Sequence, residues 1–292
     1  RISLNKRMMD GSKFERHKQE FFQNELDIAR RANHENIIKF FDTSSVQDEN
    51  HRFGYILQEL GTPSYDHPDH LNLRSISYCK NKSISLSDIF CAVTHDFSRG
   101  LHYLHTIGYV AADVKLKNSV MFNIGPNLRF KLIDFGHASI MSNTVGMGDP
   151  FTPPECLMTF FKEGFTQEDR DVGNRKLDEF ILGSVLMDIL TWTVRSDRSK
   201  SCSIETYMPH IENMMKLRFR KVPSTYVDWL DGLLKQRPSQ RINMENIAQL
   251  TKGTLRADFE KLSDLPFSFD RDEYKSTDFE NNFCMSEMND AY

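Results

Sequence analysis

The sequence has little of what marks several broad classes of protein. Its five cysteines are scattered through 292 residues and never form a C-x-x-C pair, which argues against a disulfide framework and a zinc site. No hydrophobic run approaches the roughly 20 residues of a membrane-spanning helix. The first residues also lack the apolar core of a signal peptide. With a net charge of −4, no basic surface points to a nucleic acid. We therefore expect a cytoplasmic or nuclear protein that binds neither membrane nor nucleic acid.

The composition that is present fits an ordinary globular protein. Hydrophobic residues make up 39% of the chain and charged residues 27%. The length is enough for one large domain or two lobes with a sizeable core. The chain begins at Arg1 and not at Met, so we expect further residues before it in the complete protein.

One stretch, residues 109–136, carries polar residues in a pattern that suits phosphoryl transfer. It contains Asp113, Lys115 and Asn118 as an Asp-x-Lys-x-x-Asn pattern, and later Asp134 as the first residue of Asp-Phe-Gly. A carboxylate can orient or deprotonate an attacking hydroxyl, and carboxylate and amide oxygens bind Mg²⁺. Asp113 suits the first task, while Asn118 and Asp134 suit the second. Lys115 suits the neutralisation of charge on the transferred phosphoryl group.

This stretch resembles the catalytic loop and the metal-binding loop of the eukaryotic protein kinases, whose patterns are H-R-D-L-K-x-x-N and D-F-G. Here they read A-A-D-V-K-L-K-N and D-F-G. The resemblance implies an α+β, two-lobed protein-kinase-like fold. It predicts a partial, mostly β N-terminal lobe with the hinge over residues 1–61 and a large, mostly α C-terminal lobe over residues 62–250. Residues 251–292 remain as an acidic tail that contains phenylalanines.

The resemblance also implies which residues bind ATP and Mg²⁺. In kinases a strand lysine contacts the phosphates and pairs with a helix glutamate, and Lys6 and Glu25, 19 positions apart, match these two. A second register aligns I-S-L-N with the family pattern V-A-x-K and puts Asn5 in the place of the lysine. We favour Lys6, because Asn5 carries no charge to pair with phosphate. The hinge, whose backbone holds the adenine edge, includes Glu59 and Gly61.

The sequence departs from the family pattern in three ways. No Gly-rich loop precedes the strand of Lys6, and Ala111 and Ala112 replace the His and Arg of H-R-D. Ala111 removes packing under the Phe of D-F-G, worth about 1–3 kcal/mol unless a neighbour fills the gap. Without the arginine, a phosphate on the activation loop lacks its charge partner. We therefore expect that the main switch is not phosphorylation of Ser139, Ser142, Thr144 or Thr152.

Two further residues match structural positions of the family. Glu155, in Pro-Pro-Glu, resembles the A-P-E glutamate, which pairs in kinases with an arginine far along the chain, and Arg241 is the candidate here. Residues 176–192 are strongly apolar and resemble the buried central helix of the large lobe. There, Asp178 is expected to hydrogen-bond the catalytic-loop backbone.

The leading interpretation is a serine/threonine kinase that uses ATP and Mg²⁺ to phosphorylate protein substrates. Lys115, two residues after the catalytic Asp, is typical of serine/threonine kinases. The departures above support a second interpretation, a pseudokinase that acts as a scaffold or an allosteric binding module. A third is a kinase-like enzyme that acts on a small molecule. The sequence leaves the protein substrate and the oligomeric state open.

Overall fold

The computed structural model describes residues 2–9, 13–47, 52–63, 86–122, 128–140, 153–157, 166–191 and 224–250. The side chains of some of these residues, among them residues 2–20, lie outside this description. The helices and strands, in chain order, are β1 Ile2–Met9, α1 Lys13–Arg31, β2 Phe40–Gln47, β3 Arg52–Glu59, β4 Thr62–Pro63, α3 Leu86–Thr106, β5 Tyr109–Val110, η1 Leu116–Asn118, β6 Ser119–Phe122, β7 Arg129–Leu132, β8 Ser139–Ile140, α4 Pro154–Leu157, α5 Gln167–Val172, η2 Gly173–Lys176, α6 Leu177–Thr191, α8 Ser224–Leu233, η4 Pro238–Gln240 and α9 Met244–Leu250.

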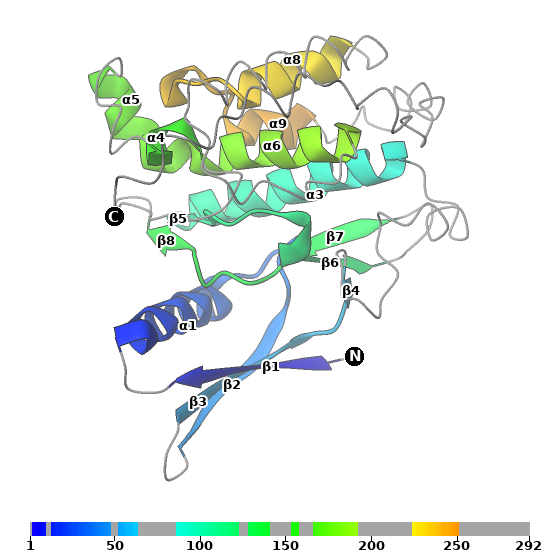
Figure 1. Cartoon of the computed structure of the whole chain (residues 1–292). Helices are drawn as coiled ribbons and strands as arrows, with labels where there is room; N and C mark the ends of the chain where they lie inside the picture. Colours follow the sequence, from blue (N-terminus) through cyan, green and yellow to red (C-terminus); the bar gives the residue numbers. More distant parts are fainter. Residues whose placement is uncertain are drawn as a thin grey trace, which may run out of the picture.

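The N-terminal part forms a three-stranded antiparallel sheet with one helix beside it (Figure 1). The strand order is β1-β3-β2, so β3 is the central strand. In the described part of α1 the buried residues are Phe22, Glu25 and Ile28, which recur every three positions and so share one face. Helical periodicity in the sequence predicts a face with Phe21, Leu26, Ile28 and Ala29; of these Ile28 is buried, and the other three are only half-buried. The helix turns its Glu25 face inward, and Phe21 lies at the edge of that face.

One strand of this sheet lies further along the chain than the sequence predicted. The apolar run from Ile37 to Phe41 favoured a strand there, but β2 begins at Phe40 and continues to Gln47. Ile37 instead forms an isolated parallel bridge with Leu132 of β7. The run is apolar because Ile37 and Ile38 are buried between the lobes, each 1% exposed.

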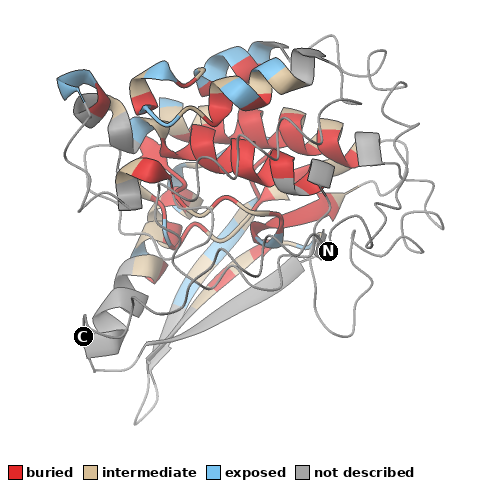
Figure 2. Ribbon diagram, turned by 45° about the horizontal axis from the view of Figure 1, so that its top comes forward, coloured by how far each residue is buried: buried red, intermediate tan, exposed pale blue. Residues whose placement is uncertain are grey.

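The C-terminal part is built around two long helices, α3 and α6 (Figure 1). Apolar residues at helical spacing in the sequence predict one buried stripe on α3, and it is confirmed, because every one of its members is 0% exposed: Ile89, Val93, Phe97, Leu101 and Leu104. In α6 every residue from Leu177 to Met187 is buried, as predicted for a central helix. Figure 2 shows this concentration of buried residues in the middle of the molecule.

Two small sheets lie between these bodies and carry the segments of interest. β4, β6 and β7 form one sheet, and β5 pairs with β8 in another. The α+β, two-lobed arrangement implied by the resemblance is therefore confirmed, with the catalytic-loop residues at the junction of the lobes (Figure 1). Among the described residues, no helix is long and apolar enough to cross a membrane.

Candidate active site

The catalytic-loop segment makes a tight turn at Ala112. The Asp113 N–H donates to the Ala111 carbonyl oxygen at 2.8 Å, which closes a three-residue turn with Ala112 at its centre. Ala112 has a φ of 62°, in the left-handed region that costs an L-residue about 1–2 kcal/mol. The turn brings Asp113 out of the buried chain, since Ala111 and Ala112 are buried and Asp113 is partly exposed.

A buried carboxylate holds this turn in place. Asp178 of α6 is 0% exposed and accepts hydrogen bonds from the N–H groups of Ala111 and Ala112, each at 2.8 Å. The predicted role of Asp178 is thereby confirmed. His105, in the last turn of α3, places its Nε2 2.8 Å from Asp178 Oδ2. Burial disfavours the charged imidazole, but the hydrogen bond and charge of Asp178 outweigh it, so the pKa of His105 is raised.

Three residues of the Asp-x-Lys-x-x-Asn pattern converge on one carboxylate. Lys115 Nζ donates to Asp113 Oδ1 at 2.7 Å. Asn118 Nδ2 donates to Asp113 Oδ2 at 2.7 Å and to the Asp113 carbonyl oxygen at 2.9 Å. Both carboxylate oxygens of Asp113 therefore have a partner, and the group has a defined orientation.

Asp134 enters the same region from the end of β7. The Ile133 N–H donates to the Asn118 carbonyl oxygen at 3.0 Å, which ties the residue before Asp134 to Asn118. Asp134 has a φ of 57°. Within the described residues, it and Ala112 are the non-glycine positions with positive φ. Backbone strain of this kind concentrates at functional sites, where the surrounding structure imposes it.

The residues present fit a bound Mg²⁺ ion. Both N–H bonds of the Asn118 amide are directed to Asp113, which leaves its side-chain oxygen as the atom that could bind a metal ion. An amide oxygen and the Asp134 carboxylate are the hard oxygen donors that Mg²⁺ prefers. The described residues contain no group of three or more His, Cys, Asp or Glu side chains placed to hold a metal. The metal roles of Asn118 and Asp134 stay predictions.

Helix α1 contacts the metal-binding loop directly. Asn24 Nδ2 donates to the Gly136 carbonyl oxygen at 3.2 Å, and the rings of Phe21 and His137 lie 4.5 Å apart. The next residue, Glu25, is 0% exposed. Sequence reasoning identified Glu25 but missed the contacts of Asn24 and Phe21. A pattern search could not find them, because they join positions more than a hundred residues apart.

The register of β1 bears on which residue takes the lysine position. β1 pairs with β3 so that Asn5 is opposite Ile56 and Lys6 is opposite Tyr55. Ile56 is 0% exposed, whereas Tyr55 is half-buried. The register therefore places Asn5, and not Lys6, opposite a fully buried residue of β3. The side chain of Lys6 lies outside the description, and its pairing with Glu25 stays a prediction.

The predicted hinge residues Glu59 and Gly61 lie where the N-terminal sheet meets β6 and β7. The Glu59 carboxylate pairs with Lys131 Nζ of β7 at 2.6 Å. The backbone N–H of Glu59 donates to the Lys39 carbonyl oxygen at 2.8 Å. The nucleotide contact predicted for Glu59 stays a prediction. A Cβ atom on Gly61 would lie 2.7 Å from Val120 Cβ, so only glycine fits there without rearrangement.

The gap expected at Ala111 leaves Phe135 buried. Phe135, of Asp-Phe-Gly, is 2% exposed and Ala111 is 7% exposed, and both belong to the same hydrophobic core. The ring of Phe40 from β2 lies 6.3 Å from the ring of Phe135. Phe135 therefore keeps an aromatic contact on the side of the N-terminal lobe.

The predicted pair of Glu155 and Arg241 is confirmed. Arg241 Nη1 donates to Glu155 Oε1 and Arg241 Nη2 donates to Glu155 Oε2, each at 2.5 Å. The Arg241 side chain is 0% exposed and also donates to the Lys176 carbonyl oxygen at 2.8 Å. Of the four residues whose phosphorylation we do not expect to be the main switch, Ser139 lies in β8, and Ser142, Thr144 and Thr152 fall outside the described residues, so this expectation stays a prediction.

The chain is similar to several proteins named as probable serine/threonine-protein kinases. A probable serine/threonine-protein kinase of Dictyostelium discoideum is 26% identical over 233 residues, which is 75% of this chain and 22% of that protein. A second one from this organism is 24% identical over 239 residues, 79% of this chain and 20% of the relative. The probable serine/threonine-protein kinase fhkA, also from this organism, is 22% identical over 246 residues, 76% of this chain and 40% of the relative.

This chain spans less than half the length of these relatives. The family model of the protein kinase domain matches residues 5–251. That match extends from β1, across the lobe junction with Asp113, Asn118 and Asp134, to the end of α9. On this evidence the chain belongs to the protein kinase family.

Proposed function

We propose that this chain transfers the γ-phosphate of ATP to serine or threonine hydroxyls of protein substrates. The observation that carries the proposal is the Asp113 carboxylate, held by Lys115 Nζ and Asn118 Nδ2 at 2.7 Å each. A carboxylate fixed at both oxygens is pre-oriented toward an incoming hydroxyl. The printed names of the three relatives support the serine/threonine class.

Each residue of the loop then has one task. Asp113 orients the substrate hydroxyl and accepts its proton. Lys115, which shares the Asp113 carboxylate, brings a positive charge beside the transferred phosphoryl group. The Asn118 amide oxygen and the Asp134 carboxylate would hold Mg²⁺. When bound, this ion supplies positive charge to the phosphate oxygens of ATP.

There are two alternatives for the phosphate-binding lysine of β1: either Lys6 takes this role, or Asn5 occupies the position and β1 supplies no cation. The charge of Lys6 supports the first alternative. The β1 register supports the second, because Asn5 is opposite the buried Ile56 and Lys6 is not. Measured Mg-ATP affinity separates them: Lys6→Ala lowers it about tenfold or more if Lys6 binds phosphate, and Asn5→Ala then has the smaller effect.

The central experiment measures Mg-ATP binding and autophosphorylation of the full chain, with the phosphorylated residues located by mass spectrometry. Asp134→Ala should abolish Mg²⁺-dependent binding and transfer, because it removes a metal ligand. Asp113→Asn should lower transfer by about 10²–10⁴-fold, as expected for a lost general base, and leave binding intact. Asp231→Asn, at an exposed pair in α8, is the control. Transfer that survives Asp134→Ala would contradict the proposed metal role.

A second candidate function is a pseudokinase scaffold. Two observations favour it: Ala111 and Ala112 replace the His and Arg of the family pattern, and the register of β1 places Asn5, not Lys6, opposite the buried Ile56. A scaffold would bind nucleotide or a partner without phosphate transfer. Mg-ATP binding by the wild type with no detectable transfer to any serine or threonine would decide for this function.

A further inference from the structure

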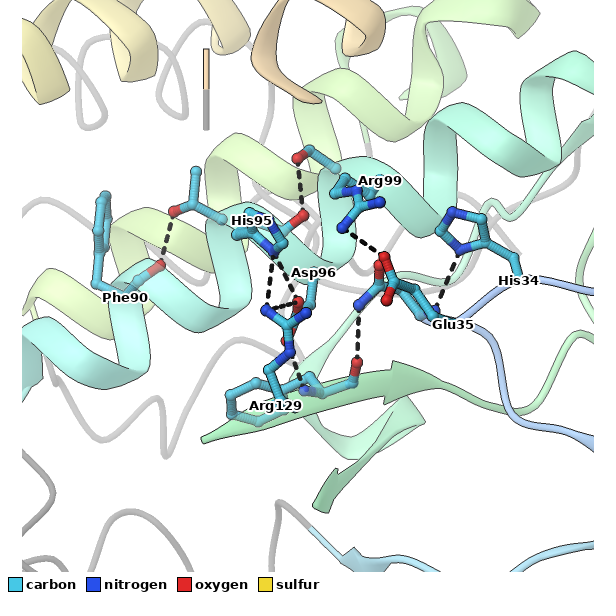
Figure 3. A network of polar contacts seen from close by, with 11 residues as sticks. His34, Glu35, Phe90, His95, Asp96, Arg99 and Arg129 are labelled. Carbon is cyan, nitrogen blue, oxygen red and sulfur yellow. Dashed lines mark hydrogen bonds and ion pairs between the residues drawn. The ribbon is translucent and has the colours of Figure 1, made fainter. Parts of the chain in front are cut away.

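One face of α3 carries polar residues that contact other parts of the chain. Asp96, Arg99 and Tyr103 are spaced at i, i+3 and i+7, so they share that face. Asp96 is 0% exposed. Figure 3 shows Asp96 and Arg99 on the helix, turned toward β7 and toward the segment of His34 and Glu35. None of these side chains belongs to the loop that holds Asp113.

Asp96 binds the backbone of β7. Its Oδ2 accepts a hydrogen bond from the Phe130 N–H at 2.7 Å. Its Oδ1 lies 2.8 Å from His95 Nδ1 and 3.3 Å from Arg129 Nη1. The short contact indicates that His95 Nδ1 carries a hydrogen and donates it to Asp96 Oδ1, since two acceptors would otherwise face each other. The buried carboxylate therefore has donors at both oxygens (Figure 3).

The segment after α1 binds the same edge of β7. Asn36 Nδ2 donates to the Phe130 carbonyl oxygen at 3.4 Å. The Leu132 N–H donates to Asn36 O at 2.9 Å, and the Ile38 N–H donates to Leu132 O at 3.0 Å. Alternate residues of a strand use the same edge, so Phe130 and Leu132 have all their backbone groups bonded away from β6. Two residues beyond Leu132 comes Asp134.

The same helix face also anchors the end of α1. Arg99 Nη1 lies 2.5 Å from Glu35 Oε1. The Tyr103 hydroxyl accepts from the Asn33 N–H at 3.0 Å and donates to the Arg31 carbonyl oxygen at 3.3 Å. The segment that follows α1 is thus bound to α3 on one side and to β7 on the other.

A glycine on α3 makes this close contact possible. A Cβ atom on Gly100 would lie 3.0 Å from Leu132 Cδ1 and 3.1 Å from Asn36 O. Both distances are tighter than ordinary contacts, and the second is to a backbone atom that bonds β7. α3, β7 and the 33–38 segment therefore pack so closely here that there is no room for a larger residue at Gly100 without rearrangement.

We propose that Asp96 is a positioning residue for Asp134. Its carboxylate fixes Phe130, and the fully bonded strand between Phe130 and Asp134 transmits that position to the metal-binding loop. Without this acceptor the buried Phe130 N–H loses its partner, and the strand end shifts to recover one. The inference rests on the proposed function, because it assigns Asp96 a role in Mg²⁺-dependent transfer.

The test compares Asp96→Ala with the conservative Asp96→Asn in the full chain. The amide oxygen of asparagine still accepts from the Phe130 N–H, whereas alanine offers no acceptor. The control is Thr94→Val. Thr94 is also a buried polar residue of α3, 1% exposed, but it bonds only within the helix, to Phe90 O at 2.7 Å.

Two measurements are made on each variant. The first is amide hydrogen exchange of residues 130–136, with residues 177–187 of α6 as the internal reference. The second is the Mg²⁺ concentration that gives half-maximal phosphate transfer. A less stable kinase that is still mostly folded under the assay conditions keeps nearly the same Mg²⁺ concentration at half-maximum, because the apparent affinity falls only in proportion to the folded fraction.

Asp96→Ala should raise exchange in residues 130–136 and the half-maximal Mg²⁺ concentration by about tenfold each, the ratio expected when one buried hydrogen bond is lost. Asp96→Asn and Thr94→Val should stay within about threefold of wild type. An unchanged Mg²⁺ requirement in Asp96→Ala, with an active wild type, overturns the inference and leaves the proposed function standing. Thr94→Val with the same shift also overturns it. A wild type that neither binds Mg-ATP nor transfers phosphate overturns the proposed function, and the inference with it.

Discussion

At the scale of single residues, the candidate site contains backbone conformations that its own sequence does not favour. Ala112 and Asp134 have φ values of 62° and 57°. Neither is glycine, so each conformation is imposed by surrounding bonds. For Ala112 those bonds are the N–H contact to Asp178 and the turn that Asp113 closes onto Ala111. The strain at Ala112 is local and can be measured.

Ala112→Gly should raise the free energy of unfolding by about 0.5–1 kcal/mol. Glycine removes the left-handed penalty, and its larger entropy loss on folding cancels only part of that gain. Ala111→Gly is the matched control, because Ala111 is the adjacent buried alanine and its φ is not positive. It should lower stability by about 1 kcal/mol. Urea unfolding of both variants measures the difference, and equal signs would contradict the strain at Ala112.

The pair of His105 and Asp178 predicts a pH dependence of stability. The pKa of His105 is raised in the folded state, because Asp178 favours the charged imidazole more strongly than burial disfavours it. A raised pKa means that the native state binds the proton more tightly than the unfolded state. The stability from this pair is therefore complete below the unfolded pKa of about 6.5, and it falls as the pH rises through the folded pKa.

The test is urea unfolding of wild type and His105→Gln between acidic and alkaline pH. The stability difference between them should be largest at the acidic end and should shrink as the pH rises. In an Asp178→Asn background the substitution should lose this pH dependence, because the charge that raises the pKa is gone. A difference that grows toward alkaline pH would show that the sign is wrong.

At the scale of elements, the hinge is pressed against β6. Gly61 precedes β4, which pairs with β6 through Thr62 and Met121. This pairing brings the Gly61 backbone so near Val120 that a Cβ atom would lie 2.7 Å from Val120 Cβ. The hinge residue Gly61 is therefore packed tightly against β6.

Gly61→Ala should destabilise the chain by about 1–3 kcal/mol, the usual cost of forcing an extra carbon into a packed interior. The control is Gly232→Ala in α8, where the nearest side-chain atom to the added carbon is 3.3 Å away, on Ile242. Alanine also favours a helix over glycine by about 1 kcal/mol, so this variant should stay near wild type. Thermal unfolding measures both, and equal losses would contradict the close approach at Gly61.

At the scale of the whole molecule, one ion pair joins distant parts of the large lobe. Glu155 lies in α4, and Arg241, 86 positions later, precedes α9. Arg241 also donates to the Lys235 carbonyl oxygen at 2.9 Å, and its guanidinium lies 4.9 Å from the Phe180 ring of α6. The pair therefore ties three regions of the lobe together.

Removing one partner of this pair should cost about 3–5 kcal/mol, because it leaves the other charge buried and unpaired. We expect this loss for Arg241→Met, and a smaller one for Glu155→Gln, whose side chain retains hydrogen-bonding atoms. The double variant should lose less than the sum of the two. Guanidinium unfolding of the four proteins measures the coupling, and additive losses would show that the two groups do not stabilise each other.

Local patterns were enough to predict much of the large lobe. The apolar stripe of α3, the burial of α6 and the pairing of Glu155 with Arg241 are confirmed, because each follows from periodicity or from a motif with a matched partner. The strand prediction failed at a residue of the N-terminal part that pairs with the C-terminal part of the chain. Ile37 is predicted as part of a strand because it is apolar, yet it precedes β2, is buried and forms an isolated bridge with Leu132 of β7.

The amino-acid sequence on its own gives the pattern of Asp113, Lys115 and Asn118, because these residues are only a few positions apart, and the resemblance of this pattern to the kinase loops implies the two-lobed fold. Folding in three dimensions adds the contacts that place these groups: Asp178 on the catalytic turn and Asp96 on β7. Those contacts join residues 34 to 67 positions apart. No local preference encodes them, because a buried carboxylate finds its donors only once helices and strands have packed around it.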